Sequence, residues 1–192
     1  RIPTCSPISK HVILSNFCLH HYRDLPGVLI QIRRALKPDG LMLAIFPGEG
    51  TLHELRSSLQ HAEMFLCDGV SPRVYPTIDL QAAAGLIQRA GYALPVVDSE
   101  RVTITYKDIF GLIDDLRGMG ETNSLYARHK AMPHRGLFDQ ASQYYATHFS
   151  DSDGRIRASF DMIALTGWAP ADSQPKPLPR GSATHSLADV LE

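Results

Sequence analysis

The sequence has 192 residues, of which 44% are hydrophobic and 20% are charged, and its formal net charge is −1. This size and composition suit one globular domain with an extension, and the balanced charge gives no general attraction to nucleic acid. No apolar stretch reaches the roughly 18 residues that a membrane-spanning helix needs. Three widely spaced cysteines, Cys5, Cys18 and Cys67, argue against a disulfide framework and favour a reducing compartment.

The chain is organised around residues 12–46, which predict a strand, a helix and a second strand. The apolar runs 12–14 and 41–46 do not alternate with polar residues, as expected of strands that are covered on both faces. Between them, Asp24 can cap a helix of about three turns. Residues 37–40, Lys-Pro-Asp-Gly, then end the helix in a turn. We therefore expect a right-handed βαβ unit.

Further helices and strands are predicted after this unit. Thr51 and Glu54 have the spacing of a capping box, in which the Thr51 hydroxyl bonds the Glu54 amide and Glu54 reaches back. The expected elements are a helix from Thr51 to about Leu66, a helix from Asp79 to Gly91, strands at 94–97 and 102–106, a helix at 108–116, a largely helical segment at 124–149 broken at Met132-Pro133, and a final strand at 157–168.

Both ends of the chain are expected to be irregular. Residues 1–11 form a lead-in, and residues 169–192 form an extended, proline-containing tail with one helical turn at 186–191. The tail carries the polar residues Gln174, Lys176, Arg180 and Ser182. It either wraps the domain, clamps a partner or is a disordered terminus.

Ligands of open α/β sheets bind outside the carboxyl ends of the strands, which here are residues 15–21 and 47–51. His20 is a candidate general base or substrate contact, and the alternative is a surface or packed histidine. His20 and His21 point to opposite sides in extended chain, so they cannot both face one ligand. Glu49 has no evident structural role, which makes it a candidate for substrate contact.

The glycine-containing loop 117–123 is a candidate lid. Glu121 could pair with an arginine guanidinium there, or the loop could be a turn between helices with Thr122 as cap. Thus His20, Glu49 and Glu121 are the candidate catalytic residues. We expect no metal site, because CxxC and HExxH patterns are absent from the sequence and Cys18 with His20 are too few ligands.

Several segments carry a family resemblance. Residues 14–48, LSNFCLHHYRDLPGVLIQIRRALKPDGLMLAIFPG, resemble the second half of class I S-adenosylmethionine (SAM) methyltransferases. The segments GEGTLHELRSSLQHAE, GVSPRVYP, LRGMGETN and SQPKPLPRGSA resemble the complex I assembly factor of mitochondria and its bacterial relatives. The malonyl-carrier-protein methyltransferase of biotin synthesis is a more distant likeness. This resemblance covers nearly all of residues 12–190.

The resemblance implies an α/β fold: the second half of a doubly wound, Rossmann-like methyltransferase sheet over 12–168, with a helical insertion at about 107–149 before the last strand. It implies SAM as cofactor, with Ser15, Asn16 and Leu19 near its methionine and adenosine parts. The alternative is that Ser15 and Asn16 only terminate the strand. The implied partner is an iron–sulfur subunit of NADH:ubiquinone oxidoreductase, modified on an arginine, in the bacterial cytoplasm or the mitochondrial matrix.

The first half of the family's sheet, with its glycine-rich SAM loop, has no counterpart in residues 1–11. We therefore expect an open hydrophobic edge at residues 12–14, and a chain that is marginally stable alone, oligomerises or is half of a longer protein. The functional alternatives are an ordinary SAM methyltransferase acting on a small carboxylate or carrier-bound acyl group, and a truncated, non-catalytic chain that binds a partner.

Overall fold

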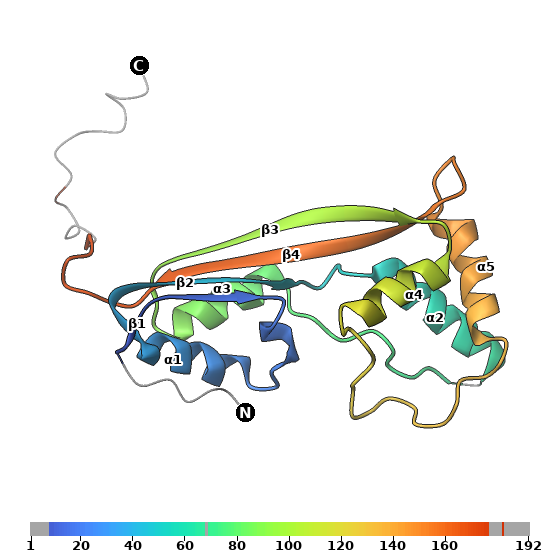
Figure 1. The fold of residues 1–192 in the computed structure, drawn as a ribbon, viewed down its shortest axis with the longest axis horizontal. Helices are drawn as coiled ribbons and strands as arrows, with labels where there is room; N and C mark the ends of the chain where they lie inside the picture. The colour runs from blue at the N-terminus through green and yellow to red at the C-terminus, as the bar shows by residue number, and fades with distance from the viewer. Residues whose placement is uncertain (1–7, 68, 177–181, 183–192) are drawn as a thin grey trace, which may run out of the picture.

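The computed structural model describes residues 8–67, 69–176 and 182. They form a mixed four-stranded sheet in the order β1-β2-β4-β3, with helices packed against it (Figure 1). The predicted α/β architecture is confirmed. The strands are β1 (Lys10–Asn16), β2 (Leu36–Pro47), β3 (Ala93–Tyr106) and β4 (Ile156–Trp168). The helices are the 3₁₀ turn η1 (Leu19–His21), α1 (Leu25–Ala35), α2 (His53–Leu66), α3 (Leu80–Arg89), α4 (Ile109–Gly118) and α5 (Leu137–Phe149). In the ranges described, no helix combines the length and apolar character of a membrane span.

The predicted βαβ unit is present. β1 and β2 are parallel neighbours, and α1 connects them. Asp24 caps α1 by accepting a hydrogen bond of 2.9 Å from the amide of Gly27. Residues 37–40 are not a separate turn as predicted, because β2 already begins at Leu36. They form a bulge in the pairing with β1, at which Asp39 adopts a positive φ of 63°.

The last two strands form one long antiparallel pair, and the chain between them contains α4 and α5. β3 is continuous over Ala93–Tyr106, so the two separate strands that the sequence predicts are one strand, held by pairing with β4 along almost its whole length. β4 also pairs antiparallel with β2. β1 and β3 are therefore the edges of the sheet, as expected for residues 12–14.

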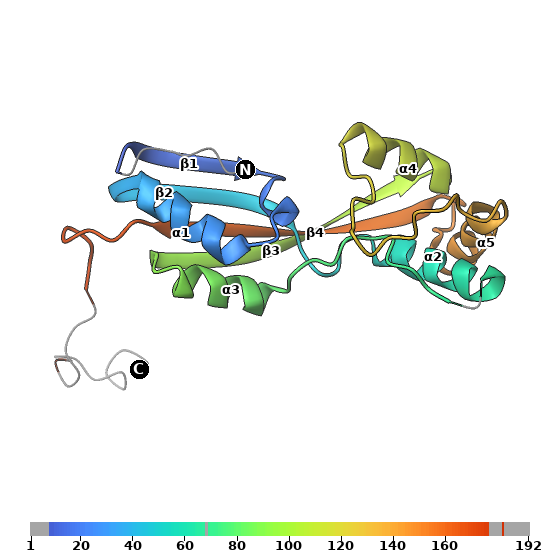
Figure 2. The ribbon, with the colours of Figure 1, turned by 90° about the horizontal axis from the view of Figure 1, so that it is seen from below.

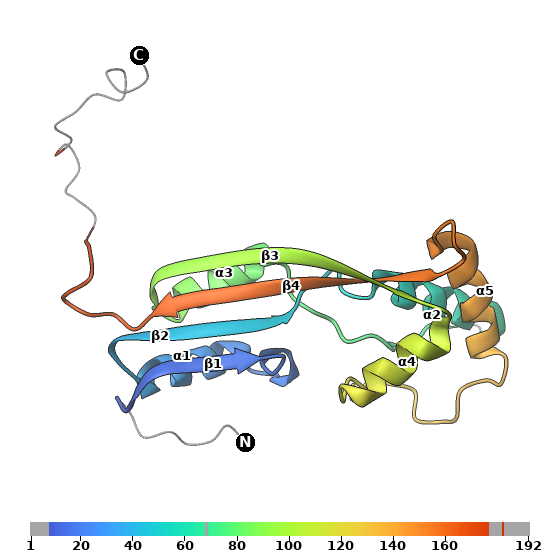
Figure 3. The same cartoon turned by 45° about the horizontal axis from the view of Figure 1, so that its top comes forward.

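Two hydrophobic clusters lie along the antiparallel pair of β3 and β4. The first packs α1 and α3 against one face of the sheet, and these helices lie on that same side in two views (Figures 1 and 2). The second gathers α2, α4 and α5 around the far ends of β3 and β4, where they form a separate group (Figure 3). The molecule is consequently elongated, with a gap in its helical covering where the two clusters meet.

Two local predictions are wrong. Residues 124–136 contain no helix, and helix α5 begins only at Leu137. The predicted capping box is also absent: α2 begins after Leu52, which has a positive φ of 54° and no side-chain cap. The Thr51 hydroxyl instead donates to the carbonyl of Asp161 at 3.0 Å and accepts from its amide at 3.1 Å. Glu54 accepts from the amide and the hydroxyl of Ser159 in β4, so both side chains join α2 to the sheet.

The described part of the tail lies against the sheet. The Gln174 side chain donates to the Asp39 carboxylate and to the carbonyl of Ala169, each at 2.9 Å. Lys176 lies 3.5 Å from the Asp172 carboxylate. Arg180 and the predicted turn at 186–191 lie outside the described residues. The tail therefore follows the domain surface at least to Gln174.

Candidate functional site

A cavity of about 350 Å³ opens where the two clusters meet, at the carboxyl ends of β1 and β2. One wall comes from these strand ends and η1, and the opposite wall from α2, α4 and the loop after α4. Its lining is largely apolar, with polar side chains concentrated on η1 and that loop. The polar lining residues are His20, His21, Thr51, Arg73, Thr77, Arg117, Glu121, Thr122, Asn123 and Ser124.

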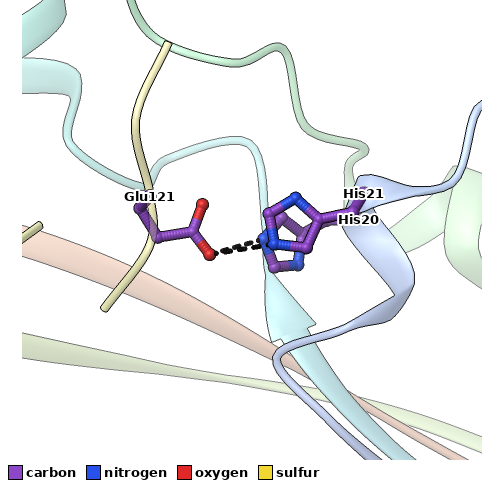
Figure 4. A group of neighbouring side chains, drawn as sticks. All are labelled: His20, His21 and Glu121. Carbon is purple, nitrogen blue, oxygen red and sulfur yellow. Dashed lines mark hydrogen bonds and ion pairs between the residues drawn. The ribbon is translucent and has the colours of Figure 1, made fainter. Parts of the chain in front are cut away.

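His20, His21 and Glu121 meet in this cavity (Figure 4). The Nε2 atoms of His20 and His21 lie 2.9 Å and 3.3 Å from the same carboxylate oxygen, Oε1 of Glu121. The His20 side chain is only 6% exposed, whereas that of His21 is 47% exposed. The prediction that the two histidines face opposite sides is wrong, because residues 19–21 form a 3₁₀ turn rather than extended chain. Their rings lie 4.0 Å apart between centroids.

The loop that carries Glu121 is held at several points. The Glu121 amide donates to the carbonyl of Leu116 at 2.8 Å, while Gly120 takes a positive φ of 82° that suits glycine. The side chain of Asn123 donates to the carbonyl of Pro72 at 3.0 Å. Thr122 caps no helix, since residues 121–125 have no helical structure. The alternative of a tight turn between helices is therefore wrong, and the lid remains a prediction.

A buried carboxylate fixes a further wall of the cavity. Glu63 in α2 accepts hydrogen bonds from the amide and the hydroxyl of Ser71 at 2.7 and 2.8 Å, and it pairs with Arg73 at 2.6 Å. Burial raises the pKa of Glu63, but the Ser71 hydrogen bonds and Arg73 outweigh it, so the pKa lies below its ordinary value. The sequence analysis missed this group. The sequence contains no recognised motif for it, because Ser71 and Arg73 bond a glutamate that lies 8 and 10 residues earlier in the chain.

Glu49 does not lie with the other two candidate catalytic residues. It is exposed and lines a separate hollow of about 320 Å³ together with Arg56, Gln60 and Arg73. Its amide donates to the carbonyl of Ile78 at 3.0 Å. The structure thus brings His20 and Glu121 together, and a catalytic role of Glu49 stays a prediction.

The candidate cofactor residues at the end of β1 differ in accessibility. Asn16 is exposed and Ser15 is half-buried. Leu19 is 2% exposed and packs in the first hydrophobic cluster. Asn16 can therefore reach a ligand with its side chain, whereas the side chain of Leu19 belongs to the core.

Comparison with known proteins gives consistent relatives. The chain is 40% identical over 183 residues to the "Arginine-hydroxylase NDUFAF5, mitochondrial" of Dictyostelium discoideum, covering 95% of this chain and 42% of that protein. The human protein of the same name is 37% identical over 93% of this chain and 52% of its own length. A malonyl-[acyl-carrier protein] O-methyltransferase of Xylella fastidiosa is 32% identical, over 95% of this chain and 58% of that enzyme. No family model matches.

The fold comparison agrees with the sequence comparison. A proposed methyltransferase of Bacillus halodurans superposes with a TM-score of 0.54 at 13% identity, over 89% of this chain and 74% of that chain. The chain spans about half the length of the curated relatives it matches. The resemblance predicted from the sequence is confirmed: the chain is similar along nearly its whole length to the NDUFAF5 arginine-hydroxylases, and its fold is part of the class I methyltransferase fold.

Proposed function

We propose that this chain contributes the substrate cavity of an enzyme that modifies an arginine side chain of a partner protein. The observation that carries the proposal is the His20–Glu121 contact inside the cavity at the carboxyl ends of β1 and β2. The relatives named arginine-hydroxylase, at 37–40% identity along nearly the whole chain, supply the substrate class. An iron–sulfur subunit of NADH:ubiquinone oxidoreductase is the partner that the family resemblance proposes, in the mitochondrial matrix or a bacterial cytoplasm.

The cavity suits a guanidinium group. Both histidines contact Oε1 of Glu121, and among the described residues no hydrogen bond involves Oε2. A guanidinium that enters the cavity can donate to Oε2, while the apolar lining packs against the aliphatic part of the arginine side chain. Because the carboxylate oxygen can only accept, Nε2 of His20 donates in this contact, and it is placed to give its proton to a reacting group as a general acid. Arg73 and Arg117 on the wall are paired with Glu63 and Asp114, so Glu121 is the carboxylate of the lining that can bind a cationic substrate.

SAM is the cofactor that we propose from the fold and the methyltransferase relatives. Asn16, exposed at the end of β1, fits a polar contact with it, and Ser15 would act beside Asn16. Leu19, buried in the core, would act through its backbone or by holding η1 in place. When bound, SAM supplies an electrophilic methyl group, and the contribution of these residues is binding and orientation.

Two other functions have specific support. The 32% identity to a malonyl-[acyl-carrier protein] O-methyltransferase favours methyl transfer to a carrier-bound carboxylate. The open sheet described below favours a chain that binds a partner without catalysis. In both cases a protein-bound arginine would remain unmodified.

The test is co-expression of this chain with a candidate iron–sulfur subunit, followed by mass spectrometry of the subunit's arginines. We expect one arginine to gain the mass of an oxygen atom if the reaction is hydroxylation, or of a methylene group if it is methylation. The variant Glu121→Gln should lower the modified fraction at least about tenfold, because the guanidinium loses its ionic partner.

The matched control for this test is Glu100→Gln on β3, which removes an exposed carboxylate that is not among the cavity residues. It should leave the modification unchanged. An unmodified arginine with wild-type protein, together with a methylated malonyl carrier, would replace the proposal by the carrier-bound acyl substrate. Calorimetric titration with SAM separately measures whether this chain binds the cofactor.

A further inference from the structure

Three potential metal-ligand atoms converge in the cavity. Nε2 of His20, Nε2 of His21 and Oε1 of Glu121 come from η1 and from the loop after α4, and the three residues form a group whose ligand atoms lie within 4.8 Å of one another. We propose that these residues bind one divalent transition-metal ion, with iron(II) as the first candidate. The sequence predicted no metal site, because CxxC and HExxH patterns are absent and Cys18 with His20 are too few ligands. The third ligand, Glu121, is 101 residues away from His20.

The separations between the ligand atoms suit one shared ion. Ligand atoms about 2.1 Å from a metal lie about 3.0 Å apart at an octahedral angle and about 3.4 Å apart at a tetrahedral angle. The observed nitrogen–oxygen distances of 2.9 Å and 3.3 Å are close to these two values. A small shift of the side chains therefore allows an ion to replace the hydrogen-bonded contacts.

A second observation points to a missing component of this site. The Nδ1 atom of His20 is buried and has no hydrogen-bond partner among the described residues, and only 6% of the His20 side chain is exposed. A buried polar atom without a partner is unfavourable. If Nε2 binds a metal, Nδ1 carries the proton and needs an acceptor, so this buried atom marks an incomplete polar environment around His20 and does not by itself identify the ligand.

A second histidine–glutamate contact, between His53 and Glu54, differs in how many hydrogen bonds the carboxylate already accepts. Nδ1 of His53 lies 3.3 Å from Oε2 of Glu54, but Glu54 also accepts two hydrogen bonds from Ser159. Glu54 is thus satisfied by the backbone and side chain of β4, and only one imidazole approaches it. At Glu121 two imidazoles converge on one oxygen at the wall of an open cavity, which is the geometry of a ligand set rather than of a packing contact.

The ligand types indicate the class of metal. Imidazole suits iron, zinc, cobalt and nickel, and two histidines with one carboxylate leave coordination positions open for small molecules. Such sets are typical of non-haem iron(II) centres. These positions would face the cavity, and their use in arginine chemistry rests on the proposed function. Metal binding itself can be measured without the reaction.

The experiment is metal titration of the purified full chain, with iron(II) under anaerobic conditions and with cobalt(II) as a spectroscopic probe. We expect one ion per chain and a cobalt absorption spectrum typical of nitrogen and oxygen ligands. The variants His21→Ala and Glu121→Gln should each weaken binding at least about tenfold. His129→Ala and Glu100→Gln are the matched controls, because both residues are exposed and are not among the cavity residues.

Two results would overturn the inference: a wild-type chain that binds neither ion, or ligand variants that bind both ions as well as wild type. Circular dichroism establishes that the variants are folded. His20 is buried, so His21 and Glu121 carry the test if His20→Ala does not fold. Metal binding without arginine modification would refute only the proposed function. Modification that persists with a chelator and no metal would refute a role of the ion in the modification, whereas the titration alone decides whether the site binds metal.

Discussion

Glu63 illustrates how one carboxylate holds a loop at the wall of the cavity. Its two oxygens are bonded by Ser71 and Arg73, and its side chain is only 6% exposed. Because unpaired groups at such a site are unfavourable, the arrangement ties residues 71–73 to α2. The position of Arg73 in the cavity therefore depends on a residue outside it.

The pH dependence of stability should report this carboxylate. The pKa of Glu63 is lowered from 4.5 in the folded protein, so its contribution to stability is complete above 4.5 and is lost as the pH falls through the folded value. We expect Glu63→Gln to lower the free energy of unfolding by about 1–3 kcal/mol at neutral pH. The difference from wild type should shrink in acid, as measured by urea unfolding across the pH range.

Glu100→Gln is the control for this measurement, because Glu100 is exposed. Its effect on unfolding should be small at every pH. A constant difference between Glu63→Gln and wild type from neutral to acid pH would contradict the assigned role of the ionised carboxylate.

The packing of α3 against β4 depends on Gly167, which has no side chain. A Cβ atom at Gly167 would lie 2.9 Å from the side chains of both Ile87 and Tyr92. Ile87 is fully buried, and the Tyr92 hydroxyl donates to the carbonyl of Leu29 at 2.9 Å. The contact therefore also fixes α3 relative to α1.

We expect Gly167→Ala to destabilise the chain by about 1–3 kcal/mol, because the added methyl group overpacks the interface between α3 and the sheet. Thermal unfolding measures the change. The matched control is Gly118→Ala at the end of α4, where a Cβ atom would have no neighbour within 4 Å. Equal changes in stability for the two substitutions would contradict this prediction, because they would show that α3 can move to make room for the methyl group.

At the scale of the whole molecule, one face of the sheet is left uncovered by the residues that the structure describes. Met42, Ala44 and Phe46 of β2 are buried toward α1 and α3, whereas their neighbours Leu43 and Ile45 are 39% and 41% exposed. The register pairs Leu14 with Leu43, and Leu43 with Thr166, so exposed apolar residues of several strands share this face. They are Val12, Leu14, Leu43, Ile45 and Val96.

This face predicts self-association of the chain. Contiguous exposed apolar surface is rare in monomers, and β1 is also an edge strand that can pair with another strand. Light scattering over a range of concentrations should show dimers or larger species, and Leu14→Lys should shift the equilibrium toward monomer. The control Met132→Lys changes a side chain that is 94% exposed in a loop and should have no effect. A wild-type chain that stays monomeric would refute this prediction.

Local sequence patterns were sufficient for most of the elements. The caps Asp24, Asp79 and Asp108 each accept a bond from an amide three residues ahead, and such short-range contacts can be recognised in the sequence. Apolar runs likewise located the strands. The error at 124–136 arose because helical composition there has no apolar face to pack, and tertiary packing provides most helical stability.

The cavity depended on contacts between distant residues. Thr51 and Glu54 have the spacing of a capping box, yet their partners lie in β4, 110 and 105 residues away respectively. His20 and His21 face the same way only because the chain forms the turn η1 after β1. Glu121 reaches them only because α4, which follows β3, lies on the opposite wall of the same cavity. A sequence pattern indicates interactions between residues that are close together in the sequence. The convergence of the three ligands is set by how the two clusters pack, and that information resides in the folded chain alone.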